Sequence, residues 1–315
     1  MKLFFYCIIF PTLSLLGAKI GVVGWAKGDP YIQPYLEEKL APLGHQTEVI
    51  WKGADFDSYD LIVSSNTHLF LNDFKYKTII STFEPPIIIS EHGNYNTYSN
   101  YLCIFTWHHD ICNGNQIKKF YYPCEHKQDL DLTTMIPFKK RKLACMVNSH
   151  LINWHPEELY SARKTICRFY QKHYPYSLSL YGKRGWGKDF YPVFKGMAED
   201  KDLVLRSHKF NYCYENWLND TYYISEKLFE SFNSLCVPIY LGSSKVTKYI
   251  PKETFIDARK FKSLDELHTF LATMSEETYL SYINAIIAFN KSETVKLFSF
   301  DHHKESILLE ILSHL

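Results

Sequence analysis

Short apolar runs alternate with longer amphipathic stretches along the first part of the chain. The run KIGVVGW at 19–25 has the continuous hydrophobicity of a buried strand, and Asp29-Pro30 offers a helix N-cap and a first-turn proline for a segment ending near Leu40. Further strands are predicted at 47–51, 60–66, 77–83 and 100–107. Continuous apolar strands separated by crossover-length segments are typical of a parallel sheet covered on both faces, so we expect an α/β fold.

A second alternation of the same kind begins after Pro137. It predicts strands at 143–149, 176–181, 209–215 and 237–242, and helices at 156–173 and about 225–234. The capping box Ser263-Leu264-Asp265-Glu266 opens another helix, and residues 295–315 are amphipathic and helical in pattern. We therefore expect a first domain at 19–138, a second at 139–294 and a C-terminal helix at 295–315. A cleft between the carboxyl ends of the two sheets is where ligands bind in such folds.

Composition narrows the class of protein. The 315 residues are 46% hydrophobic, which excludes intrinsic disorder, and 35 Lys and Arg balance 34 Asp and Glu, which argues against a basic nucleic-acid module. Aromatic residues are frequent, with 24 Tyr, 22 Phe and 6 Trp. Aromatic faces stack on sugars and bases, but they also fill ordinary cores, and most of these rings are expected to be core.

Residues 1–18 have the pattern of a signal peptide or short membrane anchor. One cation is followed by an apolar run from Leu3 to Leu16 and by the small residues Gly17 and Ala18. This run contains Pro11 and is shorter than the roughly 20 residues that span a bilayer, so a buried strand or core helix is the alternative. Eight cysteines without a CxxC pair indicate mostly free, buried thiols. The protein would be membrane-associated or in the secretory pathway or Golgi if 1–18 is an anchor, and cytoplasmic otherwise.

Several motifs for phosphate or metal binding are present but incomplete. The segment 182–189 fits GxxxxGK of a P-loop, yet Asp189 stands where a Ser or Thr should contact Mg²⁺, and Tyr191-Pro192 interrupts the helix that should follow. Asp-x-Asp triplets occur at 55/57, 129/131 and 200/202, none of them at the end of a strand. His108-His109-Asp110 could be metal ligands, but adjacent side chains of an extended chain lie on opposite faces, which favours ordinary loop polarity. We predict no protein-bound metal.

Glu84 is a better candidate for chemistry. It follows the apolar strand at 77–83 and precedes Pro85-Pro86, which prevent a regular helix from continuing. A carboxylate there would face the cleft at the carboxyl end of a strand, where partial desolvation raises its pKa toward the range of a general base. Many strands end in acidic residues, so a structural role is the alternative.

The segment 209–243 carries the densest set of polar candidates. Its pattern is a strand, a polar loop, a helix whose first turn holds Ser225, Glu226 and Lys227, and another strand. A helix N-terminus presents free N–H groups and a positive dipole end, to which Lys227 adds a full charge, so a diphosphate could bind there. A capped helix with a salt bridge at its start is the alternative.

This segment resembles the α-1,3/4-fucosyltransferases of glycosyltransferase family 10. The residues that match the family signature are Phe210, Tyr214-Glu215-Asn216, Tyr223-Ile224-Ser225-Glu226-Lys227 and Val237-Pro238-Ile239 with Gly242. Outside this segment the resemblance is weaker. It matches Glu84 to the acidic catalytic base of the family and Arg163 to the arginine of its donor domain, with Arg168 as the alternative for that arginine. Trp217 replaces the usual Ser after the signature Asn, and the loop between Asn216 and Lys227 is one residue longer than usual.

The resemblance implies a GT-B fold, with two Rossmann-like domains facing across a cleft. It also implies an inverting transfer of L-fucose from GDP-β-L-fucose to an N-acetylglucosamine-containing glycan, in α-1,3 or α-1,4 linkage. Glu84 would be the general base, and Arg163 and Lys227 would stabilise the departing GDP. Asn216, Tyr223 and Glu226 would contact the donor. No cofactor or metal would be obligatory, although a divalent metal could stimulate.

Three other functions remain open at this point. A GT-B enzyme could use another nucleotide sugar, a catalytically silent glycan-binding protein could keep the fold, and a P-loop kinase is a distant alternative. The expected partners are GDP-fucose and a glycan acceptor, with no nucleic acid and with membrane association only through residues 1–18. Acceptor choice is expected to lie in the N-terminal half, where the resemblance is weakest.

Overall fold

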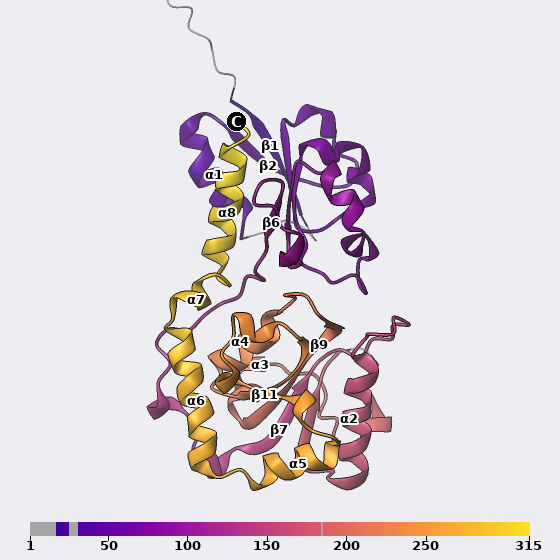
Figure 1. Ribbon diagram of the computed structural model, residues 1–315, viewed down its shortest axis with the longest axis vertical. Helices are drawn as coiled ribbons and strands as arrows, with labels where there is room; N and C mark the ends of the chain where they lie inside the picture. Colours follow the sequence, from indigo (N-terminus) through magenta and orange to yellow (C-terminus); the bar gives the residue numbers. More distant parts are fainter. Residues whose placement is uncertain (1–16, 25–30, 184) are drawn as a thin grey trace, which may run out of the picture.

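Two parallel sheets, one in each half of the chain, organise the molecule (Figure 1). The computed structural model describes residues 17–24, 31–183 and 185–315. The first sheet has the order β2-β1-β3-β4-β5-β6 and the second the order β11-β10-β9-β7-β8. The predicted α/β fold with two Rossmann-like halves is confirmed.

The strands of the first sheet are β1 (Lys19–Val23), β2 (Gln46–Ile50), β3 (Leu61–Ser64), β4 (Thr78–Ser81), β5 (Cys103–Thr106) and β6 (Ile117–Lys119). Those of the second are β7 (Lys142–Val147), β8 (Leu178–Tyr181), β9 (His208–Asn219), β10 (Val237–Ser243) and β11 (Ile256–Asp257). β3, β4 and β5 are buried at every position, which is why their sequences are continuous apolar runs without alternation.

Helices and 3₁₀ turns cover both sheets. The first half has α1 (Gln33–Leu40), and the second has α2 (Tyr160–His173), α3 (Lys201–Arg206), α4 (Glu226–Asn233), α5 (Leu264–Thr273), α6 (Glu276–Asn290) and α7 (Glu293–Lys296). The predicted N-cap is present at α5, where the Ser263 side chain accepts the Glu266 N–H, and the Glu266 carboxylate accepts the N–H of Lys262 in place of that of Ser263. In the part of the chain that the structure describes, no helix is long and apolar enough to cross a membrane.

The end of the chain differs from the single helix expected over 295–315. The helix is broken after Lys296, and α8 (Phe300–Leu312) begins anew with the Ser299 side chain as its N-cap. α8 crosses back to the first half and lies beside α1 (Figure 1). Ile307 and Ile311 are fully buried there in one core with residues of β1 and α1, so this helix completes the first core.

Other expectations differ in detail or lie outside the described residues. Residues 1–16 and the proposed cap Asp29-Pro30 are outside the described ranges. The sequence pattern did not predict β6, β11 or α3, each of six residues or fewer. The seven cysteines that the structure describes are free, and six of them are buried, as expected.

Aromatic and polar contacts join the two halves. The Trp107 ring, just beyond β5, meets the rings of Trp217 and Tyr223 edge-on at centroid distances of 5.5 and 5.9 Å. Asp110 is bonded to Lys245 and accepts a hydrogen bond from the Tyr222 hydroxyl at 3.2 Å. The carboxyl end of the first sheet is thereby held against the end of β9 and the loops that follow β9 and β10.

Candidate functional site

Glu84 lies where the sequence predicted, three residues beyond β4. Its side chain is partly buried, and burial raises the pKa of its carboxyl group above the ordinary value. Two charges from the other half also act on it: Lys227 lowers the pKa of Glu84, and Glu226 raises it. Residues about 140 positions apart in the sequence therefore share one electrostatic environment.

Lys227 is held at the start of α4 by a buried carboxylate. Its ammonium group bonds the Glu215 Oε2 at 3.2 Å, the Ser225 Oγ at 2.8 Å and the Glu226 Oε1 at 3.3 Å. Only 12% of the Lys227 side chain is exposed. Burial alone would lower the pKa of Lys227, but Glu226 and Glu215 outweigh it and raise the pKa, so the residue is a permanent cation.

Glu215 is the residue of this cluster to which the sequence assigned no role. It is fully buried in β9 and accepts hydrogen bonds from both the N–H and the hydroxyl of Ser225, at 2.9 and 2.7 Å. Ser225 therefore uses its side chain to bind Glu215 and not to cap α4. The available signal was a Glu that follows Phe210, Tyr212 and Tyr214 at alternate positions of the strand, which indicates a buried charge that needs a partner.

Glu226 is the most accessible of these charges. Its side chain is 38% exposed and lines a cavity of about 370 Å³ together with Glu230 and with residues of the first half, Phe83 and Tyr122 among them. Burial would raise the pKa of Glu226, but Lys227 and Lys201 lower it below its ordinary value. A carboxylate in a cavity between the halves, beside a lysine, can accept hydrogen bonds from the hydroxyls of a ligand.

Arg163 comes to the same region from the first turn of α2. It is 2% exposed, and its guanidinium donates to the Tyr214 carbonyl at 2.6 Å and to the Asn216 Oδ1 at 3.0 Å. Its Nε has no partner, and its charge acts on Lys227. Arg168, the rival, is exposed on the same helix and donates to the Asp189 carbonyl at 2.6 Å, so the structure brings only Arg163 to the Lys227 cluster.

Tyr223 is buried between the two halves. It is 2% exposed and packs edge-on against Trp107 and, at 6.5 Å, against Tyr122. Burial raises the pKa of its phenol well above the ordinary value, so its hydroxyl stays protonated. Of the six predicted site residues, four interact across the two halves, namely Glu84, Tyr223, Glu226 and Lys227. Arg163 and Asn216 bond each other within the second half, where the charge of Arg163 acts on Lys227.

The incomplete motifs have structural roles. Gly187 is followed by the 3₁₀ turn Lys188–Phe190 and not by the helix that a P-loop requires. Asp131 and Asp200 cap short helices, and Asp202 pairs with Arg206. Among residues 17–24, 31–183 and 185–315, no three His, Cys, Asp or Glu side chains are grouped as metal ligands.

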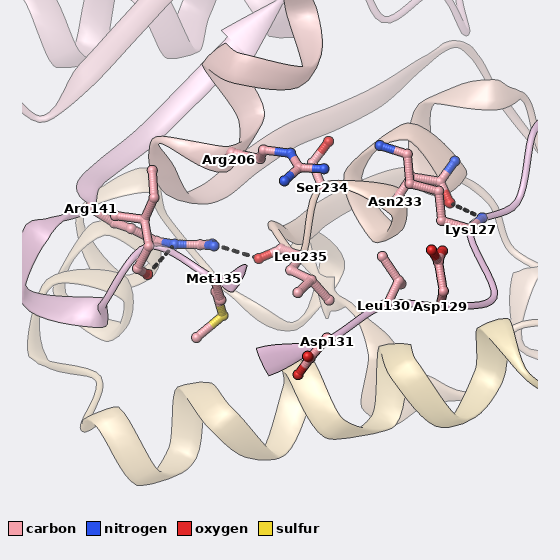
Figure 2. A pocket seen from close by; sticks show the side chains of 11 residues that line it. Lys127, Asp129, Leu130, Asp131, Met135, Arg141, Arg206, Asn233, Ser234 and Leu235 are labelled. Atoms are coloured by element: carbon pink, nitrogen blue, oxygen red, sulfur yellow. Dashed lines mark hydrogen bonds between the residues drawn. The ribbon is translucent and has the colours of Figure 1, made fainter. Parts of the chain in front are cut away.

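A further cavity of about 430 Å³ lies at the opposite end of α4 (Figure 2). Arg141 points toward it, but its guanidinium is already used by the carbonyls of Ile136 and Leu235 and the hydroxyl of Tyr279. None of the predicted site residues lines this cavity. The interface between the halves is therefore the candidate site.

Two parallel-stranded Rossmann-like halves make up the GT-B fold of glycosyltransferases, and the solved α1,3-fucosyltransferases that this chain resembles share this fold. An α1,3-fucosyltransferase crystal structure matches with a TM-score of 0.58 and 16% identity, over 95% of this chain and 91% of that one. An α1,3-fucosyltransferase solved with GDP-fucose matches with a TM-score of 0.55 and 17% identity, over 91% and 90% of the two chains.

Sequence comparison identifies the family. The model described as glycosyltransferase family 10 (fucosyltransferase), C-terminal part, matches residues 137–306, more than half of the chain. The chain belongs to glycosyltransferase family 10, the fucosyltransferases.

Curated relatives share part of their length with this chain. Mouse 4-galactosyl-N-acetylglucosaminide 3-alpha-L-fucosyltransferase 9 is 32% identical over 151 residues, which are 46% of this chain and 37% of the mouse protein. Alpha-(1,3)-fucosyltransferase FucT of Helicobacter pylori is 30% identical over 96 residues, 28% of this chain and 20% of that protein.

Proposed function

We propose that this protein transfers L-fucose from GDP-β-L-fucose to a hydroxyl of an N-acetylglucosamine-containing glycan, with inversion at the anomeric carbon. The observation that carries the proposal is the meeting of Glu84 with the Lys227 cluster at the interface between the halves. Membership of the fucosyltransferase family supports it, as does the likeness to a fucosyltransferase solved with GDP-fucose. Residues 19–138 would then form the acceptor side and 139–294 the donor side.

The donor diphosphate would bind to the second half. Lys227 and Arg163 supply two buried cations, and the N-terminus of α4 adds free N–H groups and the positive end of its dipole. Negative charge that grows on the departing GDP is stabilised most by cations that are already fixed in position. Glu215 holds the Lys227 side chain, and Asn216 holds that of Arg163. This arrangement can assist departure of GDP with no step that needs a metal ion.

Glu84 would act as the general base. Its carboxylate takes the proton of the acceptor hydroxyl while the hydroxyl oxygen bonds to the anomeric carbon of fucose, and the bond from that carbon to the β-phosphate oxygen breaks toward GDP. Burial raises the pKa of Glu84 and so strengthens it as a base. Tyr223, Glu226 and Asn216 would contact the donor, with Glu226 offered to sugar hydroxyls in the cavity beside Phe83.

Replacing the base tests the proposal. Glu84→Gln should slow fucose transfer by about 10²- to 10⁴-fold, the usual contribution of a general base, while the affinity for GDP-fucose stays nearly unchanged. Glu91→Gln, an exposed glutamate on the following turn, is the matched control and should be fully active. Full activity of Glu84→Gln would refute its role.

The donor requires a separate measurement. Calorimetry with GDP-fucose, GDP-mannose and a UDP-sugar should show binding of GDP-fucose in preference to the other two, and Lys227→Ala should weaken that binding. Tighter binding of another nucleotide sugar would replace the proposed donor. An acceptor screen with type 1 and type 2 disaccharides and N-glycan cores would then identify the acceptor and the linkage.

A further inference from the structure

The main chain of Glu84 is held on both sides by buried side chains. Asn66 Oδ1 accepts the N–H groups of Phe83 and Glu84 at 2.9 and 3.1 Å. His92 Nδ1 bonds the Glu84 carbonyl oxygen at 2.6 Å. Both polar groups of the Glu84 backbone are thus satisfied by side chains that are 0% exposed, while its carboxyl group interacts with the charges of Lys227 and Glu226 in the other half.

The topology explains why these contacts are needed. β3 pairs with β4 only as far as Ser64 and Ile80, so the N–H groups beyond β4 have no partner strand on that side. The turn after β3 supplies a side chain in place of a strand. A buried N–H without a partner is costly, and one amide oxygen that accepts two of them fixes the direction in which the chain leaves the sheet.

His92 closes this arrangement into a ring of contacts. Its Nε2 accepts the Thr67 N–H at 3.2 Å, so Nδ1 carries the proton and donates to the Glu84 carbonyl. The imidazole therefore ties the turn after β3 directly to Glu84. The Tyr98 hydroxyl in turn donates to the His92 carbonyl at 2.8 Å, which anchors the segment that carries the imidazole.

Asn66 adopts an unfavourable backbone conformation to do this. Its φ is +134°, in a region that side chains other than glycine rarely occupy. Such strain persists where the surrounding structure requires it and is most frequent at functional sites. Ser64 supports the turn by donating its hydroxyl hydrogen to the Asn66 carbonyl at 2.8 Å.

We infer that Asn66 and His92 are positioning residues that fix the Glu84 carboxylate for proton transfer, an inference that rests on the proposed function. A base that is misplaced by about 1 Å can cost about 10²-fold in rate, whereas donor binding in the other half does not depend on it. Asn66 and His92 would affect kcat through the position of Glu84. Among the hydrogen bonds of the described residues, neither side chain bonds a member of the Lys227 cluster.

Asn66→Gly is the sharpest probe of this inference. Glycine accepts the positive φ without strain, so the variant should fold, but it removes the acceptor of both N–H groups. We expect kcat to fall about 10- to 100-fold with unchanged GDP-fucose affinity. His92→Gln should show a loss of the same kind. Asn72→Gly, at an exposed position on the turn that follows, is the matched control and should keep full activity.

A double-mutant cycle separates positioning from general damage. In a Glu84→Gln background, Asn66→Gly should cause no further loss of kcat, because its effect passes through the missing carboxylate. An additional loss of tenfold or more in that background would overturn the inference, as would full activity of Asn66→Gly beside an inactive Glu84→Gln. In the latter case the proposed function would stand.

Amide hydrogen exchange tests whether Asn66 holds the Glu84 backbone, and it needs no measurement of fucose transfer. The N–H groups of Phe83 and Glu84 should be protected in the wild-type protein and exchange fast in Asn66→Gly. Unchanged protection of both amides would overturn the inference. If the wild-type protein transferred no fucose, the proposed function would fail, and loss of protection would still establish the clamp on Glu84.

Discussion

The buried carboxylate of Glu215 should be essential for the stability of the second half. It is 0% exposed and bonds Lys227 at 3.2 Å and Ser225 at 2.9 and 2.7 Å. Glu215→Gln keeps the shape of the side chain and one acceptor oxygen, but it removes the charge. Lys227, 12% exposed, would then keep only Glu226 as its counter-ion, and Glu226 is itself 38% exposed.

The expected magnitude follows from this burial. Removing one partner of a buried ion pair costs about 3–5 kcal/mol because the other charge is left uncompensated. Each kcal/mol shifts the melting temperature of a domain of this size by roughly 2–4 °C, so Glu215→Gln should lower the melting temperature by about 6–20 °C. Glu230→Gln on α4, the helix that carries Lys227, is the control: the Glu230 and Lys201 side chains are each 36% exposed, and an exposed pair contributes less than about 1 kcal/mol.

Thermal unfolding followed by circular dichroism measures both variants. The double variant Glu215→Gln/Lys227→Met should be more stable than Glu215→Gln alone, because the unpaired cation is gone. A Glu215→Gln protein that melts with the wild type, or a double variant that is less stable than the single one, would refute this account of the cluster.

Three further predictions concern pH and helix capping. Burial raises the pKa of Glu84, and the charge of Glu226 raises it further, so kcat/KM should fall on acidification at a pH above the ordinary glutamate range. Glu226→Gln should move this fall to lower pH, and an unchanged pH profile would contradict the coupling of the two carboxyl groups. His303 is buried and neutral because burial lowers its pKa to about 3, whereas the unfolded chain binds the proton below about pH 6.5. This residue should therefore lower the free energy of unfolding by roughly 1.4 kcal/mol for each pH unit below that value. In urea unfolding, the loss of stability between pH 7.5 and 5.5 should be smaller by about 1.4 kcal/mol in His303→Gln than in the wild type, and an equal loss in the two proteins would contradict this. Ser263→Ala removes the N-cap of α5 and should cost about 1 kcal/mol in the same urea assay, a prediction that an unchanged unfolding midpoint would exclude.

Much of the fold could be predicted because the information is local. Buried parallel strands are continuous apolar runs, and the capping box of α5 is a four-residue signal. The placement of Glu84 followed from the same reasoning, since an acidic residue directly after a strand lies at the edge of the sheet. The first turn of α4 predicted Ser225, Glu226 and Lys227, whereas Arg163 and Asn216 came from the family resemblance and Glu215 was missed.

The remaining features depend on contacts between distant residues. The return of α8 to the first core is set by packing of Ile307 and Ile311, and its amphipathic pattern fits either half of the molecule. The run at 108–110 suggested metal ligands or loop polarity, but His109 and Asp110 connect the halves by bonding Tyr249 and Lys245. The clamp of Asn66 on Glu84 joins two turns through a side chain, and no spacing in the sequence indicates it.

The most direct test of the central claim is a single assay of fucose transfer by the wild-type protein and Glu84→Gln, with GDP-β-L-fucose and N-acetyllactosamine-type acceptors. The account predicts an α-linked fucosyl product and an equal amount of GDP from the wild type. It predicts a rate lower by about 10²-fold or more from Glu84→Gln at unchanged affinity for GDP-fucose. An equal rate from the two proteins, or release of GDP without a fucosylated product, would contradict it.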